Sequence, residues 1–417
     1  MGDAISTHGP STTGVRLILA MLGYYAAVIA VITLVPFRFL VPESYMLLLT
    51  GTLLDTAANV LLFVPLGFLY RLARPPARGP AALGVLALGV LTSCGIEAIQ
   101  LFEPARFSSP IDVAANGFGA WMGALATDRI TRFIRADSQL VARLSLEIPL
   151  MGLVYMLIPL LWLGSLAAGG DPLRFALLLL PGLFGAQLIS FVHRHRLGRP
   201  GRVSASAVAI AAGIGMFVGL FPATAAFPVG TLGLAIGVAL FVCFQATPLS
   251  PSPDARASRH ARHVSGNPDA RDRRFEGRAL RAALPFYASY LLAAAWLARA
   301  AAGPENIDRL EILRTLELAA VFTVLGYLLA EWRGRIEEPA RRVAVAVIIR
   351  AAPLATVVAG LRFLPASPAR AALWLSATVV ASLYGAGLYH LQRAHIQALI
   401  AATSDRAAPT RSRDQAA

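Results

Sequence analysis

The chain has 417 residues, of which 57% are hydrophobic and only 14% are charged. Because a water-soluble domain carries about 25% charged residues, this composition excludes a soluble protein and indicates an integral membrane protein, as does the mean hydropathy of +0.64. All 37 basic residues are arginine, which excludes mechanisms that need a lysine amine, such as a P-loop or a Schiff base. The net charge of +14 comes from arginines between apolar runs, where they set topology, so we expect no nucleic-acid partner.

Apolar segments of about 20 residues, the length of a membrane-spanning helix, follow one another along the chain. We place them at 17–37, 53–71, 80–102, 111–131, 146–168, 173–193, 203–222, 226–247, 282–302, 315–331, 343–361 and 369–390. The sequence therefore predicts an all-α, polytopic transmembrane protein with about twelve spans.

Arginine is concentrated in alternate loops, as in the second loop with Arg71, Arg74 and Arg78. The fourth, sixth, eighth and tenth loops are also rich in arginine, whereas the loops between them are not. Since short cytoplasmic loops carry an excess of basic residues, we expect both termini on the cytoplasmic side of a cell membrane.

Composition divides the chain into five parts. We expect a four-helix unit at 15–135, four further transmembrane helices at 136–247, a basic linker rich in Pro, Ser and Arg at 248–281, a C-terminal four-helix unit at 282–395 and a polar tail at 396–417. The composition of the linker is typical of a solvated cytoplasmic segment.

Polar residues within the first four spans are not scattered. They form three pairs at helical spacing, each on one helix face, with an arginine in the loop between the second and third pairs: Asp55 with Asn59, Glu97 with Gln100, Asp112 with Asn116, and Arg106. The predicted topology places all of them at the extracytoplasmic boundary. We therefore expect a polar, mainly acidic pocket that opens outward, because polar groups in a membrane are costly unless they have a role.

Three interpretations of this pocket stay open. In the first, the residues are architectural, with Asp112 in a first helical turn and Arg106 pairing with an acid. In the second, they bind a headgroup, with Arg106 on phosphate and the substrate-binding residues Asp55, Asn59, Gln100 and Asn116 on sugar or peptide. In the third, Glu97 and Asp112 are catalytic, as acid and base or as ligands of a hard divalent ion. No histidine, Ser–His or Cys–His partner accompanies these carboxylates, and we predict no resident metal and no cofactor.

These residues resemble the VanZ-like family of integral membrane proteins. The resemblance runs through Asp55-x-x-x-Asn59 with Val64-Pro65-Leu66-Gly67, Ser93-x-x-x-Glu97-x-x-Gln100 and Arg106 to Asp112-Val113-x-x-Asn116 with Gly119 and Gly123. It covers about the N-terminal third. The family is named for a protein associated with resistance to the glycopeptide teicoplanin, and its biochemical activity is not established. The resemblance implies a bacterial plasma membrane protein connected with the cell envelope or with antibiotic resistance.

The last four spans contain two segments that are weakly similar in sequence to segments of the first four. The segment Phe322–Leu328 is similar to Phe63–Leu69, and Phe363–Ala366 is similar to Phe102–Ala105, which suggests a decayed second copy. The positions that match Asp55, Asn59 and Asp112 are then Arg314, Leu318 and Leu373.

A few other polar residues carry separate expectations. Arg350, midway along its span, needs a partner, for which Glu317, Glu331 and an acid of the first four-helix unit are candidates. Arg174 lies near a span end, where its side chain can reach the interface, and His193 and His195 are expected as exposed loop residues.

Together these features predict a membrane protein that binds or acts on a cell-envelope ligand, lipid-linked or glycopeptide, on the extracytoplasmic side. Its other partners are membrane lipids. Two alternatives remain: a membrane-embedded enzyme that uses Glu97 and Asp112 on an envelope lipid, and a structural scaffold for other membrane proteins.

Overall fold

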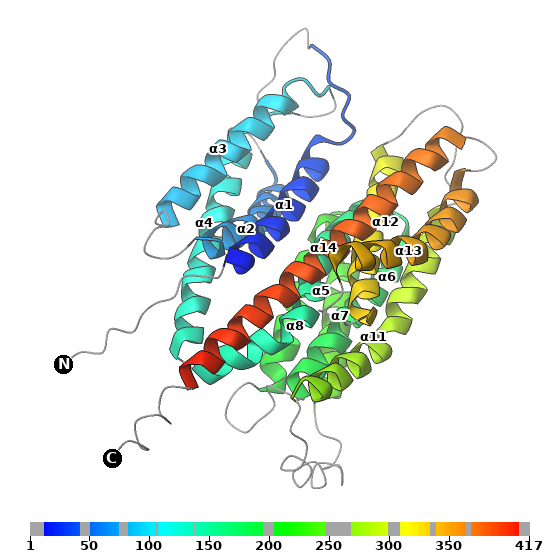
Figure 1. Ribbon diagram of the computed structural model, residues 1–417. Helices are drawn as coiled ribbons and strands as arrows, with labels where there is room; N and C mark the ends of the chain where they lie inside the picture. The colour runs from blue at the N-terminus through cyan, green and yellow to red at the C-terminus, as the bar shows by residue number, and fades with distance from the viewer. Residues whose placement is uncertain are drawn as a thin grey trace, which may run out of the picture. The chain divides into compact units, whose positions relative to one another are not determined.

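The computed structural model describes residues 12–41, 51–74, 82–104, 107–136, 138–194, 204–246, 268–298, 309–333, 339–363 and 368–407. In these ranges the chain forms α-helices and one short 3₁₀ turn, without a β-strand (Figure 1). The helices divide into two compact units, one within Met1–Pro149 and Gly387–Ala417 and the other within Leu150–Ala386.

The first unit is built on four helices, drawn from blue to cyan in Figure 1. They are α1 (Thr12–Leu34), α2 (Leu53–Leu72), α3 (Ala82–Gln100) and α4 (Pro110–Ala136). Helix α4 packs most extensively on α2 and next on α3, while α1 contacts α2 and α3. The ring of His395, on the last helix, lies against Gly14 of α1.

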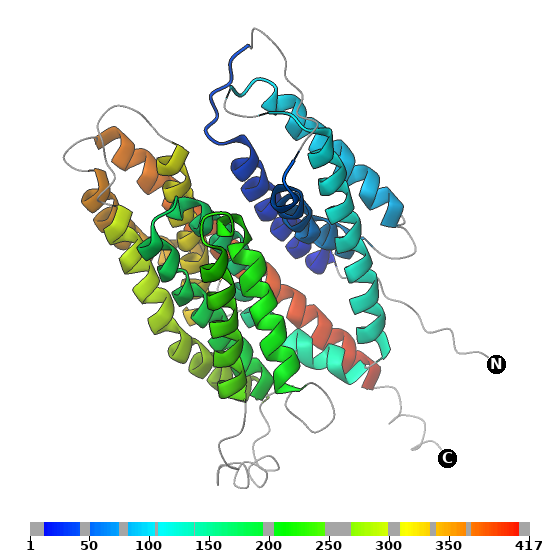
Figure 2. The ribbon, with the colours of Figure 1, turned by 180° about the vertical axis from the view of Figure 1, so that it is seen from behind.

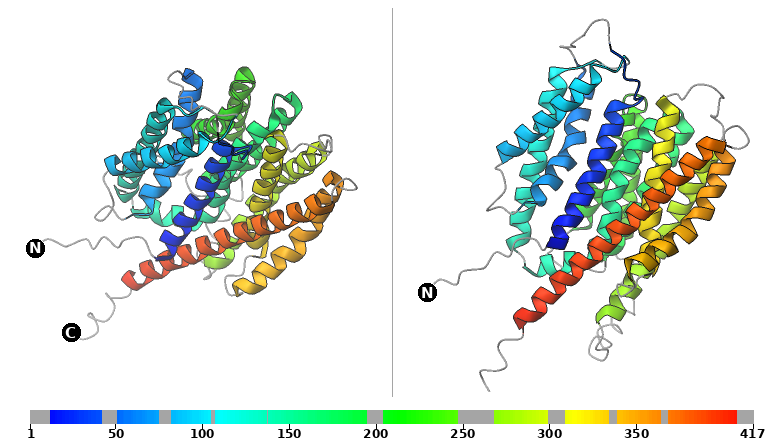
Figure 3. Two further views of the ribbon diagram at one scale, coloured as in Figure 1. Left: turned by 90° about the horizontal axis from the view of Figure 1, so that it is seen from above. Right: turned by 45° about the horizontal axis from the view of Figure 1, so that its top comes forward.

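The second unit contains the remaining helices, except for the start of α5 and the end of α14, which belong to the first unit. Within the second unit α8 and α9 pack side by side, and α7 lies against α9 and α11 (Figures 1 and 2). The bounds are α5 (Ser138–Ala168), α6 (Pro172–Leu177), α7 (Leu179–Val192), α8 (Ala205–Leu220), the 3₁₀ turn η2 (Phe221–Ala223), α9 (Pro228–Ala246), α11 (Pro268–Ala298), α12 (Arg309–Arg333), α13 (Ala340–Phe363) and α14 (Pro368–Ala407). Helix α14 is the long red helix of Figure 3 and has 40 residues.

The predicted all-α, polytopic architecture is confirmed. Among the described residues, 10 helices are long and apolar enough to cross a membrane, and the shorter apolar helix Gly152–Ala168 lies in the predicted fifth span. Helix α4, with 27 residues, occupies the predicted fourth span, but it carries Asp112, Asn116 and Asp128 and is less apolar. Helices α6 and α7 share one predicted span, interrupted at Leu178.

Two helices extend well beyond the spans predicted for them. Helix α11 begins at Pro268, before the predicted start at 282, and α14 continues to Ala407, past the predicted end at 390. Hydropathy detects only the part of a helix that is apolar enough for hydrocarbon. The extensions are rich in arginine and polar residues, and they are helical without being membrane-like.

Helices α2 and α4 approach each other at backbone distance. A Cβ atom at Gly67 would collide with the carbonyl oxygen of Ala120, and one at Gly123 would collide with that of Val64. Small residues permit such close contact between membrane helices, in which packing rather than the hydrophobic effect drives association.

The two helices run parallel, because their contacts advance together along both chains. Gly119 lies against Val60, and further along the hydroxyl of Thr127 donates a hydrogen bond of 3.0 Å to the carbonyl oxygen of Phe68. Parallel packing brings the N-termini of α2 and α4 to one end of the unit and their C-termini to the other. At the C-terminal end Arg71 forms an ion pair of 3.0 Å with Asp128.

The same approach recurs between α12 and α14 in the second unit. A Cβ atom at Gly326 would collide with the carbonyl oxygen of Ser382, and one at Gly385 would collide with that of Thr323. In the similarity between Phe322–Leu328 and Phe63–Leu69, Gly326 and Thr323 match Gly67 and Val64. This equivalence supports the interpretation of the C-terminal helices as a second copy.

The packing also corrects one detail of the sequence match. If Ser382 and Gly385 correspond to Ala120 and Gly123, the residue that corresponds to Asp112 is Trp374 rather than Leu373. Trp374 is buried and its ring lies edge-to-face against Phe322, at a centroid distance of 5.8 Å. Leu318, which matches Asn59, is buried as well. In the second pair of helices buried apolar side chains stand at both of these positions.

The close approach at Gly123 predicts a strong effect of a single methyl group. Gly123→Ala should lower the apparent melting temperature of the purified protein in detergent, because the new Cβ atom forces α2 away from α4, and overpacking typically costs roughly 1–3 kcal/mol. Gly95→Ala is the matched control, since a Cβ atom at Gly95 on α3 meets no atom within 4 Å. Equal melting temperatures for the two variants would contradict the backbone contact.

Candidate functional site

The N-termini of α2 and α4 are capped in the same way. At α2 the hydroxyl of Thr52 accepts a hydrogen bond of 3.1 Å from the backbone N–H of Asp55 and donates one of 2.6 Å to its carboxylate. At α4 the hydroxyl of Ser109 accepts a bond of 3.4 Å from the backbone N–H of Asp112. Each acid is therefore the third residue of its helix, the position that a capping box assigns to an acidic or amide side chain.

Asp55, Asn59 and Asp112 form a cluster at this end of the unit, hereafter the acidic cluster. The side chain of Asn59 hydrogen-bonds Asp112, and the carboxylate of Asp55 lies close enough to Asp112 to interact with its charge. Asp55 is exposed, and Asn59 and Asp112 are half-buried. The positive ends of two helix dipoles offset the repulsion between the two carboxylates, since α2 and α4 both begin here.

Glu97 and Gln100, at the end of α3, are buried and serve neighbouring backbone. The carboxylate of Glu97 accepts a hydrogen bond of 2.8 Å from the backbone N–H of Ser109, and the amide of Gln100 donates one of 2.8 Å to the carbonyl oxygen of Thr33. Glu97 therefore fixes the start of α4, and Gln100 fixes the end of α1.

Further hydrogen bonds hold the non-helical segment that follows α1. Glu103 is 2% exposed, and its carboxylate accepts a hydrogen bond of 2.7 Å from the backbone N–H of Arg38. The backbone N–H of Leu40 donates a bond of 2.7 Å to the carbonyl oxygen of Phe102. The two bonds join the exposed segment after α1 to the residues that follow α3.

Asn116 lies one helical turn below Asp112 and points to α3. Its amide nitrogen donates a hydrogen bond of 2.8 Å to the hydroxyl of Ser93, and both side chains are buried. The amide oxygen of Asn116 is buried without a hydrogen-bond partner. This oxygen is an acceptor held directly beneath the acidic cluster.

The structure thus separates the predicted site residues into two groups. Asp55, Asn59 and Asp112 share one cluster, whereas Glu97, Gln100 and Asn116 are buried between helices. Arg106 lies outside the described residues. The capping residues Thr52 and Ser109 were missed, although the spacings Thr52-x-x-Asp55 and Ser109-x-x-Asp112 carry the signal of a capping box.

A separate set of buried polar groups lies in the second unit. Arg174, on α6, is 7% exposed, and its guanidinium lies 3.5 Å from the carboxylate of Glu317, on α12. The phenol of Tyr290, on α11, donates a hydrogen bond of 2.6 Å to the same carboxylate. These three helices are thereby joined at one buried point.

These contacts correct three expectations from the sequence. Arg174 does not extend to an interface but is buried in an ion pair. Glu317 pairs with Arg174 rather than with Arg350, whose side chain is exposed. His193 is buried at the end of α7, although its polar neighbours in sequence suggested an exposed loop, and His195 lies outside the described residues. Within the described ranges no three His, Cys, Asp or Glu side chains are arranged to hold a metal ion.

Comparison with known protein families identifies the N-terminal part of the chain. Residues 12–134 match the family described as VanZ/LLP1, and this stretch contains every predicted site residue. The resemblance of the N-terminal third to VanZ-like proteins is therefore confirmed. Comparisons with curated proteins and with solved structures gave no match.

Two substitutions test whether the hydrogen bond from the backbone N–H of Ser109 to Glu97 stabilises the protein. Glu97→Gln keeps an acceptor oxygen and should leave the melting temperature in detergent nearly unchanged, whereas Glu97→Ala leaves the buried N–H of Ser109 without its partner, at a cost of about 1–3 kcal/mol. Cys94→Ala, at an exposed position of the same helix, controls for substitution on α3. Equal stability of all three variants would show that this hydrogen bond does not stabilise the protein.

The buried pair in the second unit predicts a non-additive response. Glu317→Ala should destabilise the protein by about 3–5 kcal/mol, because it leaves the charge of Arg174 buried and alone. The double variant Arg174→Met, Glu317→Leu removes both charges and should recover most of the loss in a double-mutant cycle of unfolding in detergent. Additive effects would show that the two side chains do not interact.

Proposed function

We propose that this protein is a multi-pass membrane protein of the bacterial cell envelope, and that its VanZ-like unit binds a lipid-linked or glycopeptide ligand at the acidic cluster. The observation that carries the proposal is the division of the polar residues. Glu97, Gln100 and Glu103 have their hydrogen bonds inside the protein, whereas Asp55 and Asp112 are held together at an exposed end of the helix pair.

The acidic cluster is suited to hydrogen-bond donors. A carboxylate accepts at about four lone-pair positions. The described contacts of Asp112 and Asp55 include one side-chain donor each, Asn59 and Thr52, which leaves acceptor capacity. Sugar hydroxyls, amino groups and peptide N–H groups are the complementary donors, and the headgroups of glycopeptides and of lipid-linked glycopolymer precursors carry all three. Arg106, which precedes the N-terminus of α4 in sequence, remains the proposed contact for a phosphate.

Charge at the two ends of the helix pair supports an outward-facing cluster. Helix α2 begins at the acidic cluster, carries Arg71 in its last turn and is followed by Arg74, and α4 begins there and reaches Arg129 near its other end. Since arginine accumulates on the cytoplasmic side of membrane proteins, the arginine-bearing ends belong in the cytoplasm. The acidic cluster then faces the extracytoplasmic side, where envelope ligands are found.

Substitution of Asp112 tests this proposal. In purified full-length protein in nanodiscs, Asp112→Asn should weaken binding of teicoplanin, or of a polyprenyl-linked disaccharide peptide, by about tenfold, equivalent to roughly 1.4 kcal/mol and typical of a hydrogen bond to a charged group. Asp128→Asn is the matched control, since it removes the same charge from the opposite end of the same helix.

Three outcomes would contradict the proposal. Equal binding by the Asp112→Asn and Asp128→Asn proteins would remove the acidic cluster from recognition. Conversion of the bound probe, abolished by Asp112→Asn, would make the protein an enzyme instead. If the double variant Asp55→Asn, Asp112→Asn still restored glycopeptide tolerance to a deletion strain, at unchanged membrane abundance, the unit would act as a scaffold.

A further inference from the structure

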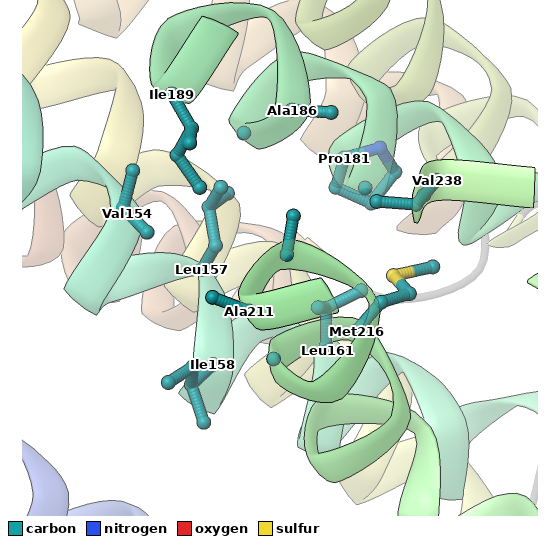
Figure 4. Close-up of a pocket in the computed structure, with 14 residues that line it drawn as sticks. Val154, Leu157, Ile158, Leu161, Pro181, Ala186, Ile189, Ala211, Met216 and Val238 are labelled. Carbon is teal, nitrogen blue, oxygen red and sulfur yellow. The ribbon is translucent and has the colours of Figure 1, made fainter. Parts of the chain in front are cut away.

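The second unit contains a cavity of about 100 Å³ between α5, α7, α8 and α9 (Figure 4). Leu157 and Leu161 of α5, Met216 of α8 and Val238 of α9 enclose it, and Figure 4 shows these side chains around a common space. It lies entirely within the second unit and is distinct from the acidic cluster.

The lining of this cavity excludes water as its occupant. Its side chains are those of aliphatic residues, one proline and one methionine, with glycine and alanine filling the remaining wall. An apolar cavity offers no hydrogen bonds to water, stays dry and takes up apolar molecules; one of roughly 150 Å³ in another protein binds benzene. The chemistry of the wall therefore selects a hydrocarbon.

The cavity is at mid-depth of the candidate spans. Gly182 is the middle residue of the span Pro172–Val192, and Gly215 lies next to the middle of the span Ala205–Ala223. Val238 lies close to the middle of Pro228–Gln245. At this depth a bilayer contains lipid chains and neither headgroups nor water.

One side of the cavity is accessible from outside the unit. Leu157, Leu161 and Met216 are buried, whereas Val154 and Ile158 are partly exposed and Ala211 is exposed. Beside this opening Ile210 and Ile214 are 60% and 59% exposed. The opening is therefore surrounded by aliphatic side chains of the kind that face lipid in a membrane.

Hydrogen bonds hold α5 and α8 together beyond one end of the cavity. The indole of Trp162 donates a bond of 3.0 Å to the carbonyl oxygen of Val218, and the hydroxyl of Ser165 donates one of 3.3 Å to that of Gly219. Below this junction the facing residues are small, including Ala211, Ala212 and Gly215. The space arises because two anchored helices face each other with too little side-chain volume between them.

We propose that this cavity is a binding site for one acyl chain of a membrane phospholipid. The chain enters between Val154, Ile158 and Ala211 and ends against the buried wall formed by Leu157, Leu161 and Met216. The inference is independent of the function proposed for the acidic cluster, because it concerns another unit and the apolar part of a lipid.

Gly215 is a suitable position from which to fill this site. It lines the cavity, and a Cβ atom placed on it meets no atom within 4 Å. Gly215→Phe therefore puts a ring into the space that the acyl chain would occupy. Gly233→Phe on α9 is the matched control, since a Cβ atom there also meets no atom within 4 Å and Gly233 does not line the cavity.

The test is photochemical labelling of the full-length protein in nanodiscs that contain phosphatidylcholine with a diazirine midway along one acyl chain. After irradiation, peptide mass spectrometry should find adducts on the buried wall residues Leu157, Leu161 and Met216. Gly215→Phe should lose these adducts and keep those on the exposed Ile210 and Ile214. Gly233→Phe should retain both sets.

The proposal is overturned if wild-type protein is labelled only at exposed positions, or if Gly215→Phe retains the adducts on the buried wall. Competition with unlabelled lipids distinguishes an acyl chain from a prenyl chain. If an excess of polyprenyl phosphate removes the adducts on the buried wall and an equal excess of unlabelled phosphatidylcholine does not, the acyl assignment is overturned in favour of a prenyl chain. If Gly215→Phe does not fold, Ala211→Leu at the opening replaces it, with the same losses expected.

Discussion

The first unit depends on the contact between the backbones of α2 and α4 at Gly67 and Gly123. Only glycine permits this distance, and the resulting parallel pair sets the positions of both helix N-termini. Two capped helix starts then lie side by side, which brings Asp55 and Asp112 together and supplies the positive dipole ends that make their proximity tolerable. The acidic cluster is therefore a consequence of backbone packing about three turns further along the helices.

Polar residues in this unit serve two different purposes. Gln100, Glu103 and Glu97 provide hydrogen-bond partners for backbone groups at the end of α1, in the segment after it and at the start of α4. These residues are part of the fold. Asp55 and Asp112 carry their charge at the edge of it, and the proposed recognition of an envelope ligand rests on them.

Much of the fold follows from sequence, because a span of apolar residues is a strong local signal, and a helix occupies every predicted span. Helix ends such as Pro268 and Ala407 were missed because polar residues continue a helix without adding hydropathy. The pairs Asp55 with Asn59 and Asp112 with Asn116 were found by spacing, which identifies a shared helix face. Spacing does not identify the partner across the interface, so the burial of Glu97 against Ser109 and the pairing of Arg174 with Glu317 required the three-dimensional structure.

The glycine contact also changes how sequence variation should be interpreted. Selection can keep glycine at the positions of Gly67 and Gly123 for steric reasons alone, whatever the protein does. The pair α12 and α14 illustrates this, since Gly326 and Gly385 preserve the contact while Leu318 and Trp374 stand at the polar positions. In relatives, glycine at these sites identifies the architecture, and only the residues that match Asp55, Asn59 and Asp112 bear on whether the chemistry has been inherited with it.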